Sequence, residues 1–236
     1  MKILYPDCIN TISAGSADSD YPASNMLDNH PQKYWLAGSG QTTETVTIVT
    51  TTGAVNGLGL FGTNATSGTV DVKNEAEDTT YETFALSGAL GRFFVEFASE
   101  YTEILHIIIE LTAADDVYVG VARCGTLLDF PDPRYGLKQN RVDYSVKEEL
   151  SNGGLYVYKR NTPRAYALDF IMSRTQFNSL DSLFNTNGSL PLAMLLSEKA
   201  GDDDRWGGFF HILDPPEGQY IQAQNIGVDI EVQEAV

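Results

Sequence analysis

The loop GDDDRWGG at residues 201–208 holds the densest set of chemically active side chains in the chain. Three carboxylates precede an arginine and a tryptophan, so the loop offers oxygen ligands for a cation and an indole face for a sugar ring. Tryptophan and arginine are also enriched in interfaces, which favours a subunit contact. A solvated loop tip, with the indole packed at the start of a strand, explains the same residues without a ligand. The predicted partner- or glycan-binding residues are Asp202, Asp203, Asp204, Arg205 and Trp206.

The other polar residues form no catalytic pattern. His30, His106 and His211 have no second histidine or cysteine at metal-ligand spacing, and we expect the last two to be ordinary hydrogen-bonded strand residues. Adjacent acids such as Asp115 and Asp116 would point to opposite faces of a strand, so only acids on different strands leave a two-carboxylate site open. No nucleophile elbow, phosphate-binding loop or dinucleotide fingerprint occurs. We therefore predict a protein that is not an enzyme and holds no cofactor and no metal.

The charge balance limits the classes of partner. Acidic residues outnumber basic residues by 32 to 15, and the net charge is −17. We find no cluster of lysines and arginines that would bind phosphates, so we expect no nucleic-acid partner. The acidity suits a particle component or a partner with a basic face, although solubility alone would also explain it. The start MKILYPDC lacks the apolar core of a signal peptide, and no apolar run reaches ~20 residues, so we expect synthesis in a cytoplasm and no membrane insertion.

The two cysteines, Cys8 and Cys124, stand near the two ends of the first predicted domain. They have no CxxC spacing, so the sequence predicts neither a metal site nor a redox motif. Two buried, reduced thiols are the favoured interpretation. A disulfide is the alternative, because the two ends of a jelly roll are often neighbours.

Short β-branched and aromatic segments recur roughly every 10–15 residues in the first half of the chain, separated by polar turns. They lie at 45–51, 55–63, 68–74, 82–88, 91–98, 104–111 and 117–123. This rhythm predicts an antiparallel jelly-roll sandwich. The glycines inside 55–63 indicate a strand that a neighbour approaches closely. Two prolines flank Asp132, so we place a domain boundary in this region, which gives domains 1–126 and 127–236.

The sequence of the second domain predicts strands around one helix. Strands are predicted at 141–150, 154–160, 164–172, 190–196, 207–214 and 220–234, with hairpin turns at 152–154 and 161–163. The helix is predicted at about 174–186, because Ser173 and Gln176 form a capping-box pattern and Asn187-Gly188 supplies a stop. The predicted fold class is mostly β: an N-terminal antiparallel jelly-roll sandwich plus a second β domain carrying one short helix.

Two stretches of the first domain resemble discoidin-type, galactose-binding-like jelly rolls. They are YPASNMLDNHPQKYW at 21–35 and LGLFGTNATSGTVDV at 58–72, and the resemblance covers roughly residues 1–125. It implies that Met26, Leu27 and Trp35 close one end of the sandwich.

Sugar-binding members of that family carry a structural calcium near this turn, and Asp28 matches one of its ligands. Lys33 stands where a ligand threonine is usual, and His30 replaces a usual Asp or Asn. Because a lysine ammonium would repel a dication, we expect no metal at this turn.

The whole chain is similar to a family of tailed-phage structural proteins in which this jelly roll precedes a second β domain with one helix. In the second half the similarity rests on an extended strand, a Gly-Gly hairpin, a strand with Tyr and Arg, and a helix that ends in Asn-Gly before a Pro, within 144–196. It implies a distal-tail or tail-tip component of a virion that forms a ring, contacts other tail proteins and catalyses nothing.

The alternative is a carbohydrate-binding module that recognises a host-surface glycan. It predicts exposed aromatic residues grouped at one loop end, such as Trp206 or Tyr135. A glycan-cleaving enzyme is a third and weaker hypothesis.

Overall fold

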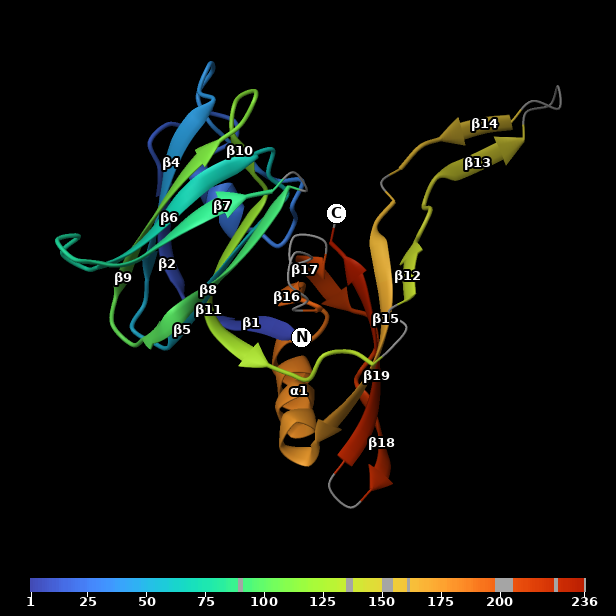
Figure 1. Cartoon of the computed structure of the whole chain (residues 1–236). Helices are drawn as coiled ribbons and strands as arrows, with labels where there is room; N and C mark the ends of the chain where they lie inside the picture. Colours follow the sequence, from blue (N-terminus) through green and yellow to red (C-terminus); the bar gives the residue numbers. More distant parts are fainter. Residues whose placement is uncertain are drawn as a thin grey trace. The chain divides into compact units, whose positions relative to one another are not determined.

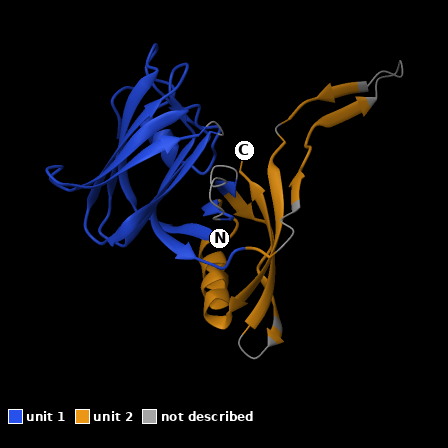
Figure 2. Cartoon of the chain, in the orientation of Figure 1, with its two compact units in different colours: residues 1–132, 192–209 blue, residues 133–191, 210–236 orange. Residues whose placement is uncertain are grey.

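The computed structural model describes residues 1–88, 91–134, 138–149, 155–160, 162–197, 206–222 and 225–235. The chain divides into unit 1, Met1–Asp132 with Leu192–Phe209, and unit 2, Pro133–Pro191 with Phe210–Val236 (Figures 1 and 2). The sequence places a single boundary after residue 126. In the structure the first change of unit follows Asp132, and the segment 192–209 returns to unit 1 because its strand β16 pairs with β1.

Unit 1 is a jelly-roll-like sandwich of antiparallel strands. One sheet has the order β2-β4-β9-β6-β7, with bounds Ile9–Ala14, Thr43–Thr50, Leu105–Thr112, Ser67–Asn74 and Thr80–Ser87. The strands of the other are, in order, β16-β1-β11-β5-β8, with bounds Leu192–Leu195, Lys2–Asp7, Val121–Asp129, Val55–Phe61 and Arg92–Tyr101. β3 (Trp35–Leu36) pairs with β10 (Tyr118–Val119), and the 3-10 helix η1 covers Ala23–Leu27. The predicted strands between residues 45 and 111 are all present, whereas β1 and β2 lie outside the predicted segments.

Side chains that alternate along the strands build the core of unit 1. The inward residues of the first sheet include Val46, Ile48, Val70, Val72, Ile107 and Ile109, and those of the second include Leu58, Leu60, Phe93 and Val95. The glycines of β5 confirm the predicted close approach, since a Cβ on Gly57 would lie 2.8 Å from Leu127 and 2.9 Å from Leu4. Larger residues there would displace this apolar layer.

The two cysteines lie side by side in unit 1. The Cys8 N–H donates to the Cys124 carbonyl at 2.7 Å, and both residues are buried free thiols. Burial is the main cause that raises the pKa of each thiol, most strongly that of Cys124.

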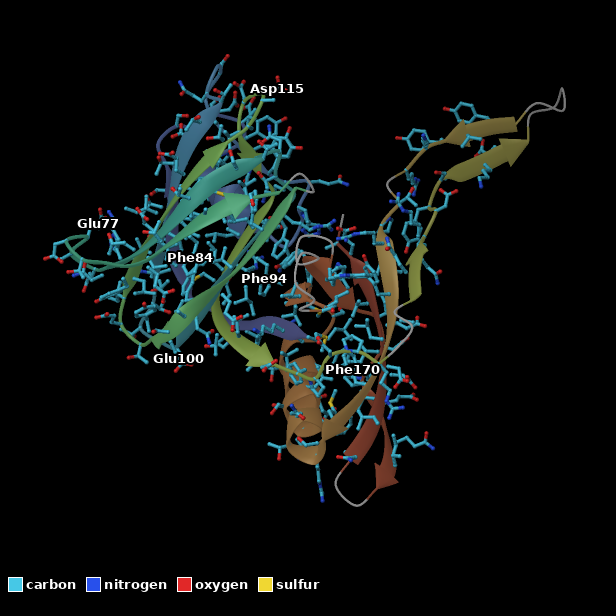
Figure 3. All side chains as sticks on the ribbon, in the orientation of Figure 1. Glu77, Phe84, Phe94, Glu100, Asp115 and Phe170 are labelled. Carbon is cyan, nitrogen blue, oxygen red and sulfur yellow. The ribbon has the colours of Figure 1, made fainter. Side chains whose placement is uncertain are left out.

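Unit 2 is an antiparallel sheet with one helix packed on it. β15 (Arg164–Ser173) pairs with β12 (Lys138–Arg141) and β19 (Asn225–Glu234), and β19 also pairs with β18 (Glu217–Gln222). The last three residues of β17 (Gly207–Ile212) pair with β19 as well. Buried and exposed residues alternate along β15 as predicted, and Phe170, labelled in Figure 3, is fully buried.

Helix α1, Arg174–Asn187, confirms the predicted helix. The Gln176 N–H donates to Ser173 Oγ at 3.3 Å, and the Ser173 N–H donates to the Gln176 side chain at 3.0 Å, which completes the capping box. Leu180 and Leu183 are buried beneath it, and Gly188 ends it with a φ of 62°. Among the described residues no helix is long and apolar enough to cross a membrane.

An arm leaves unit 2 between β12 and β15 (Figure 1). It consists of β13 (Val146–Glu149) and β14 (Leu155–Tyr158), which pair antiparallel with each other. At its base, Tyr144 Oη and the Gln233 side chain are hydrogen bonded at 3.1 Å, and the Arg160 N–H donates to Ser145 at 3.2 Å. The base of the arm is therefore attached to β19 through Tyr144.

Three predicted features of the second domain are wrong. The predicted strand at 141–150 is two strands, because Asp143 accepts the Ser145 N–H at 2.9 Å and turns the chain between β12 and β13. The predicted strand at 220–234 is the end of β18 followed by β19, two antiparallel strands that pair with each other. The turn at 161–163 joins no hairpin, since β15 pairs with β12 and β19.

Candidate functional site

Of the predicted ligand loop at 202–206, the structure describes only Trp206. Asp202, Asp203, Asp204 and Arg205 lie outside the described residues, as does Tyr135. Trp206 is half-buried immediately before β17, and its carbonyl accepts the Leu196 N–H at 3.1 Å. A ligand role for this loop stays a prediction.

Three tyrosines instead form an aromatic cluster on unit 1, which we call the tyrosine platform: Tyr21, Tyr34 and Tyr118. The rings of Tyr21 and Tyr34 are stacked with centroids 4.8 Å apart and planes 11° apart. Tyr118, on β10, lies 5.4 Å from Tyr34 with a tilt of 51°. Tyr21 is 37% exposed, so one aromatic residue of this cluster is open to solvent.

Backbone hydrogen bonds position the platform. The Leu36 N–H donates to the Tyr21 carbonyl at 3.2 Å, and the Asn25 side chain donates to the Tyr34 carbonyl at 2.9 Å. The hydrogen bond to Tyr34 raises the pKa of Tyr21. A ring face beside phenol hydroxyls is suited to stacking and hydrogen bonding with a sugar.

Arg123 on β11 holds the turn that lies between Tyr21 and Tyr34 in the sequence. Its guanidinium donates to the Met26, Leu27 and Asp28 carbonyls at 3.3, 3.3 and 3.0 Å, and to the Asn29 side chain at 2.7 Å. These carbonyls lie at the C-terminal end of η1, where a helix leaves carbonyls without intrahelical partners. The Arg123 guanidinium also lies 5.1 Å from the centre of the Phe209 ring. One buried cation thus fixes the whole turn.

The end of the sandwich is closed by two of the three residues expected there. Met26 and Trp35 are fully buried, and the Trp35 indole donates to the Ser16 carbonyl at 3.1 Å. The expectation for Leu27 is wrong, because its side chain is 38% exposed. Successive residues of a 3-10 helix point about 120° apart, so an inward Met26 directs Leu27 toward solvent.

Asp28 does not offer a free carboxylate to a cation. Lys33 Nζ lies 2.7 Å from one oxygen of Asp28 and His30 Nδ1 lies 2.9 Å from the other. Lys33, followed by His30, holds the pKa of Asp28 well below its usual range. These residues do not fit a calcium site, because the Asp28 carboxylate is already paired with an ammonium that would repel a dication. Among the described residues, no group of three or more potential ligands could hold a metal ion.

The other two histidines are hydrogen bonded within the fold, as predicted. His106 Nδ1 lies 2.5 Å from Glu77, and His211 Nδ1 lies 2.8 Å from the Ser189 carbonyl. Each has a structural partner.

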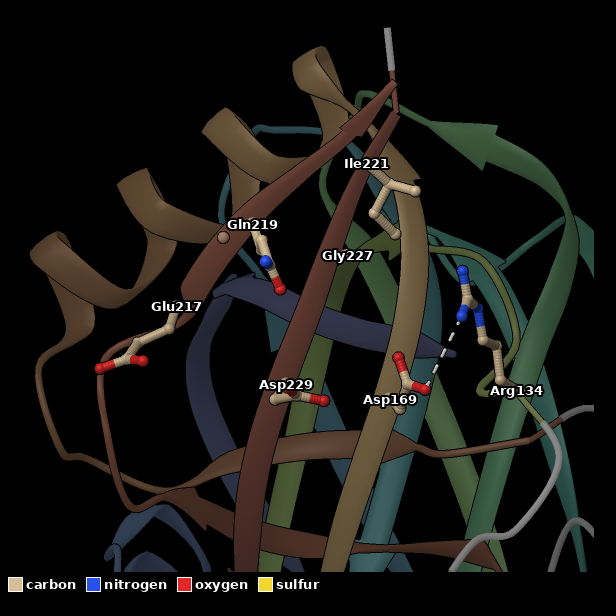
Figure 4. A pocket seen from close by; sticks show the side chains of 8 residues that line it. Arg134, Asp169, Glu217, Gln219, Ile221, Gly227 and Asp229 are labelled. Carbon is tan, nitrogen blue, oxygen red and sulfur yellow. Dashed lines mark ion pairs between the residues drawn. The ribbon is translucent and has the colours of Figure 1, made fainter. Parts of the chain in front are cut away.

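A shallow pocket of about 460 Å³ lies on the sheet of unit 2 (Figure 4). Asp169 on β15 faces Asp229 on β19, and Asp229 faces Glu217 on β18, so three carboxylates form a row across three strands. Arg134 Nη1 lies 4.0 Å from Asp169 at one end of this row. Ile221 lines the same pocket and is exposed.

Comparisons with known proteins leave the family open. No family model and no curated protein matches the chain. Among solved structures, it is similar to chitosan-binding module 1 from a chitosanase/glucanase of Paenibacillus sp. IK-5, with 17% identity and a TM-score of 0.43 over 52% of this chain and 100% of that module. It is also similar to the lectin domain of lectinolysin complexed with Lewis B antigen, with 12% identity and a TM-score of 0.40 over 48% of this chain and 90% of that domain.

A third similar structure is CpGH89CBM32-5 from Clostridium perfringens in complex with GalNAc-β-1,3-galactose, with 12% identity and a TM-score of 0.38 over 49% of this chain and 94% of that chain. All three of those proteins bind a carbohydrate. At these TM-scores the similarities assign neither a family nor a ligand to this chain.

Sequence reasoning missed the residues that matter most on unit 1. Arg123 stands in the strand segment VARCG, where nothing local distinguishes it from a surface arginine. Tyr21 and Tyr34 lie within the resemblance stretch at 21–35. Their spacing becomes a usable signal only when the turn between them is known to bring their rings together.

Proposed function

We propose that this protein is a non-enzymatic assembly component of a phage tail tip or baseplate, in which unit 2 joins copies into a ring and unit 1 recognises a cell-surface glycan. The arm carries the assembly part of this proposal. A two-stranded hairpin is marginally stable alone. The arm exposes Tyr156 (53%) and Tyr158 (56%) together with Val157, and exposed apolar surface of this kind favours an interaction site. Exposed tyrosines on a hairpin without a core of its own are the residues of an interface.

The tail is the proposed setting because the sequences of both halves of the chain resemble those of tailed-phage structural proteins. Such a component is made in the host cytoplasm, joins the virion and contacts other tail proteins besides its own copies. Nothing in this role requires a cofactor, a nucleic acid or membrane insertion.

Light scattering coupled to size exclusion tests the assembly role. The full chain is expected to have the mass of an oligomer, and negative-stain images are expected to contain rings. Replacing both arm tyrosines, Tyr156→Ser with Tyr158→Ser, should lower the mass, whereas Tyr81→Ser removes an exposed ring of unit 1 and should not. A wild-type chain that is monomeric at every concentration would overturn the assembly role.

Glycan recognition by unit 1 rests on the tyrosine platform. It comes from connecting segments and the short strand β10, and sandwich folds commonly present ligand-binding residues on such segments. The second stacked pair, Tyr81 and Tyr101, is less suited to a ligand because both hydroxyls already donate to Glu103 and Glu82, at 2.6 and 2.7 Å.

A glycan array followed by calorimetry tests this role. Tyr21→Ala should weaken binding of the best glycan by about tenfold or more, the usual effect of removing an interface aromatic. Tyr81→Ala is the matched control and should bind as the wild type does. Binding that Tyr21→Ala leaves unchanged would refute the platform as the site.

A further inference from the structure

The face of the unit 2 sheet that α1 does not cover combines exposed apolar and acidic side chains. We call it the outer face and define it by Asp169, Ile171, Glu217, Ile221 and Asp229, all of which are exposed. Ile171 faces Gly227 across the strands, and a Cβ on Gly227 would lie 2.8 Å from Ile221, so the two isoleucines flank the same glycine. The outer face therefore pairs an apolar strip with the row of three carboxylates (Figure 4).

The three carboxylates of this row have too few positively charged partners. Like charges directly opposite one another on adjacent strands destabilise a sheet. Of the ion pairs formed among the described residues, the one between Arg134 and Asp169 is the only one to reach this row, at 4.0 Å, and it lies at the edge. Asp229 is in the centre of the row, between Asp169 and Glu217. A cationic partner over the centre of this face would relieve the repulsion.

The arm and the residues that flank it carry aromatic and basic side chains, in contrast to the acidic outer face. In its register Val146 faces Tyr158 and Glu148 faces Tyr156, so both tyrosines lie on one side of the hairpin. The Arg160 guanidinium lies 5.9 Å from the centre of the Tyr158 ring and extends this aromatic side with a positive charge. The segment 138–160, which runs from β12 through the arm to Arg160, holds five of the 15 basic residues of the chain and three of its 32 acidic residues, and one of these acids, Glu148, lies on the tyrosine side of the arm. It is a basic, aromatic segment in an otherwise acidic protein.

We propose that the arm of one copy packs its Tyr156, Tyr158 and Arg160 side against the outer face of unit 2 in a second copy. The tyrosines cover the isoleucine strip, and Arg160 lies over the carboxylate row. A second copy is the occupant because its outer face offers the tyrosines an apolar strip and offers Arg160 a row of carboxylates, and a heterologous contact of this kind generates a ring where the rotation between copies closes. The inference rests on the assembly role proposed above and names its surfaces.

A charge-swap experiment on the full chain tests the contact. Lys159→Glu with Arg160→Glu reverses the arm, and Glu217→Lys with Asp229→Lys reverses the outer face. Sedimentation equilibrium should report that each reversal weakens self-association by about tenfold or more. The chain carrying all four changes should associate to within about threefold of the wild type, because the attraction is restored with opposite signs.

Two controls separate the contact from general charge effects and misfolding. Glu100→Lys changes an exposed acid of unit 1, labelled in Figure 3, and should leave association unchanged. Far-UV circular dichroism and thermal melting of every variant establish that unit 2 is folded.

The outcomes also separate this contact from the assembly role. A monomeric wild type would refute the assembly role itself. A wild-type oligomer that neither reversal weakens, or that the swap fails to restore, would overturn the arm-to-face contact while leaving assembly in place. Arm reversal that abolishes glycan binding but leaves the mass unchanged would make the arm a glycan surface and would equally overturn the contact.

Discussion

Replacing Arg123 by methionine should destabilise unit 1 more than any surface change. Methionine keeps most of the volume but loses the donors to three carbonyls of the turn and to Asn29. Only 10% of the Arg123 side chain is exposed. A buried acceptor left without its donor costs about 1–3 kcal/mol, so the loss of several acceptors' donor is expected to reach about 3–5 kcal/mol. For a unit of this size the loss corresponds to a fall in melting temperature of about 10 °C.

Tryptophan fluorescence during urea unfolding measures this loss in unit 1 selectively. The chain has two tryptophans, Trp35 and Trp206, and both belong to unit 1. Arg174→Met is the matched control, because Arg174 is exposed at the start of α1 and should change the free energy of unfolding by less than about 0.5 kcal/mol. Arg123→Lys should fall between the two, since an ammonium cannot span four acceptors as a guanidinium does. A loss below about 1 kcal/mol for Arg123→Met would refute the role of this residue as the anchor of the turn.

The pH dependence of the loss has a definite sign. Arg123 Nε lies 3.6 Å from Asp7, and burial raises the pKa of Asp7 despite the opposing attraction of Arg123. Without Arg123 that pKa rises further. A carboxyl whose folded pKa is raised contributes stability below its unfolded pKa and loses it as the pH rises through the folded value. The loss in Arg123→Met should therefore be larger at neutral pH than near pH 4. Because 39% of the Asp7 side chain is exposed, water limits the difference to less than about 1 kcal/mol.

Three further outcomes are expected. In native protein, Cys8 and Cys124 should react with a thiol reagent far more slowly than in denaturant, where both should react, because each is buried with a raised pKa; fast reaction in the native state would contradict their burial. Gly125→Ala should lower the melting temperature sharply, because a Cβ would lie 2.0 Å from the Pro6 carbonyl oxygen, and an unchanged melting curve would show that the β1–β11 pair can shift freely. Leu27→Ser should change the free energy of unfolding by less than about 0.5 kcal/mol, as judged by urea unfolding, because its side chain faces solvent; a large loss would place it in the core.

Local chemistry made some elements predictable. The capping box at Ser173 and the stop at Gly188 act within a few residues, so the sequence alone defines α1. Alternation along β15 is equally local, because one face of that strand is buried and the other is not.

Features that depend on distant residues were not predictable. β16 joins unit 1 through pairing with β1, from the other end of the chain, and no pattern in LAML indicates that partner. Arg123 acquires its role from carbonyls nearly a hundred residues earlier, which it meets only in the folded sandwich. The tyrosine platform likewise exists because the β3–β10 pair brings Tyr118 beside Tyr34.

The division of the chain among its units has a consequence for how such proteins diversify. Recombination commonly exchanges binding sandwiches between genes as contiguous segments of sequence. Here unit 1 ends only at Phe209, after the chain has passed through α1. A break after residue 126 or 132 would deprive the β1 edge of its β16 neighbour and leave an open strand exposed to aggregation. Exchange of the sandwich between genes must therefore carry α1 and the arm with it, so the proposed glycan-binding and assembly surfaces would be inherited as one block.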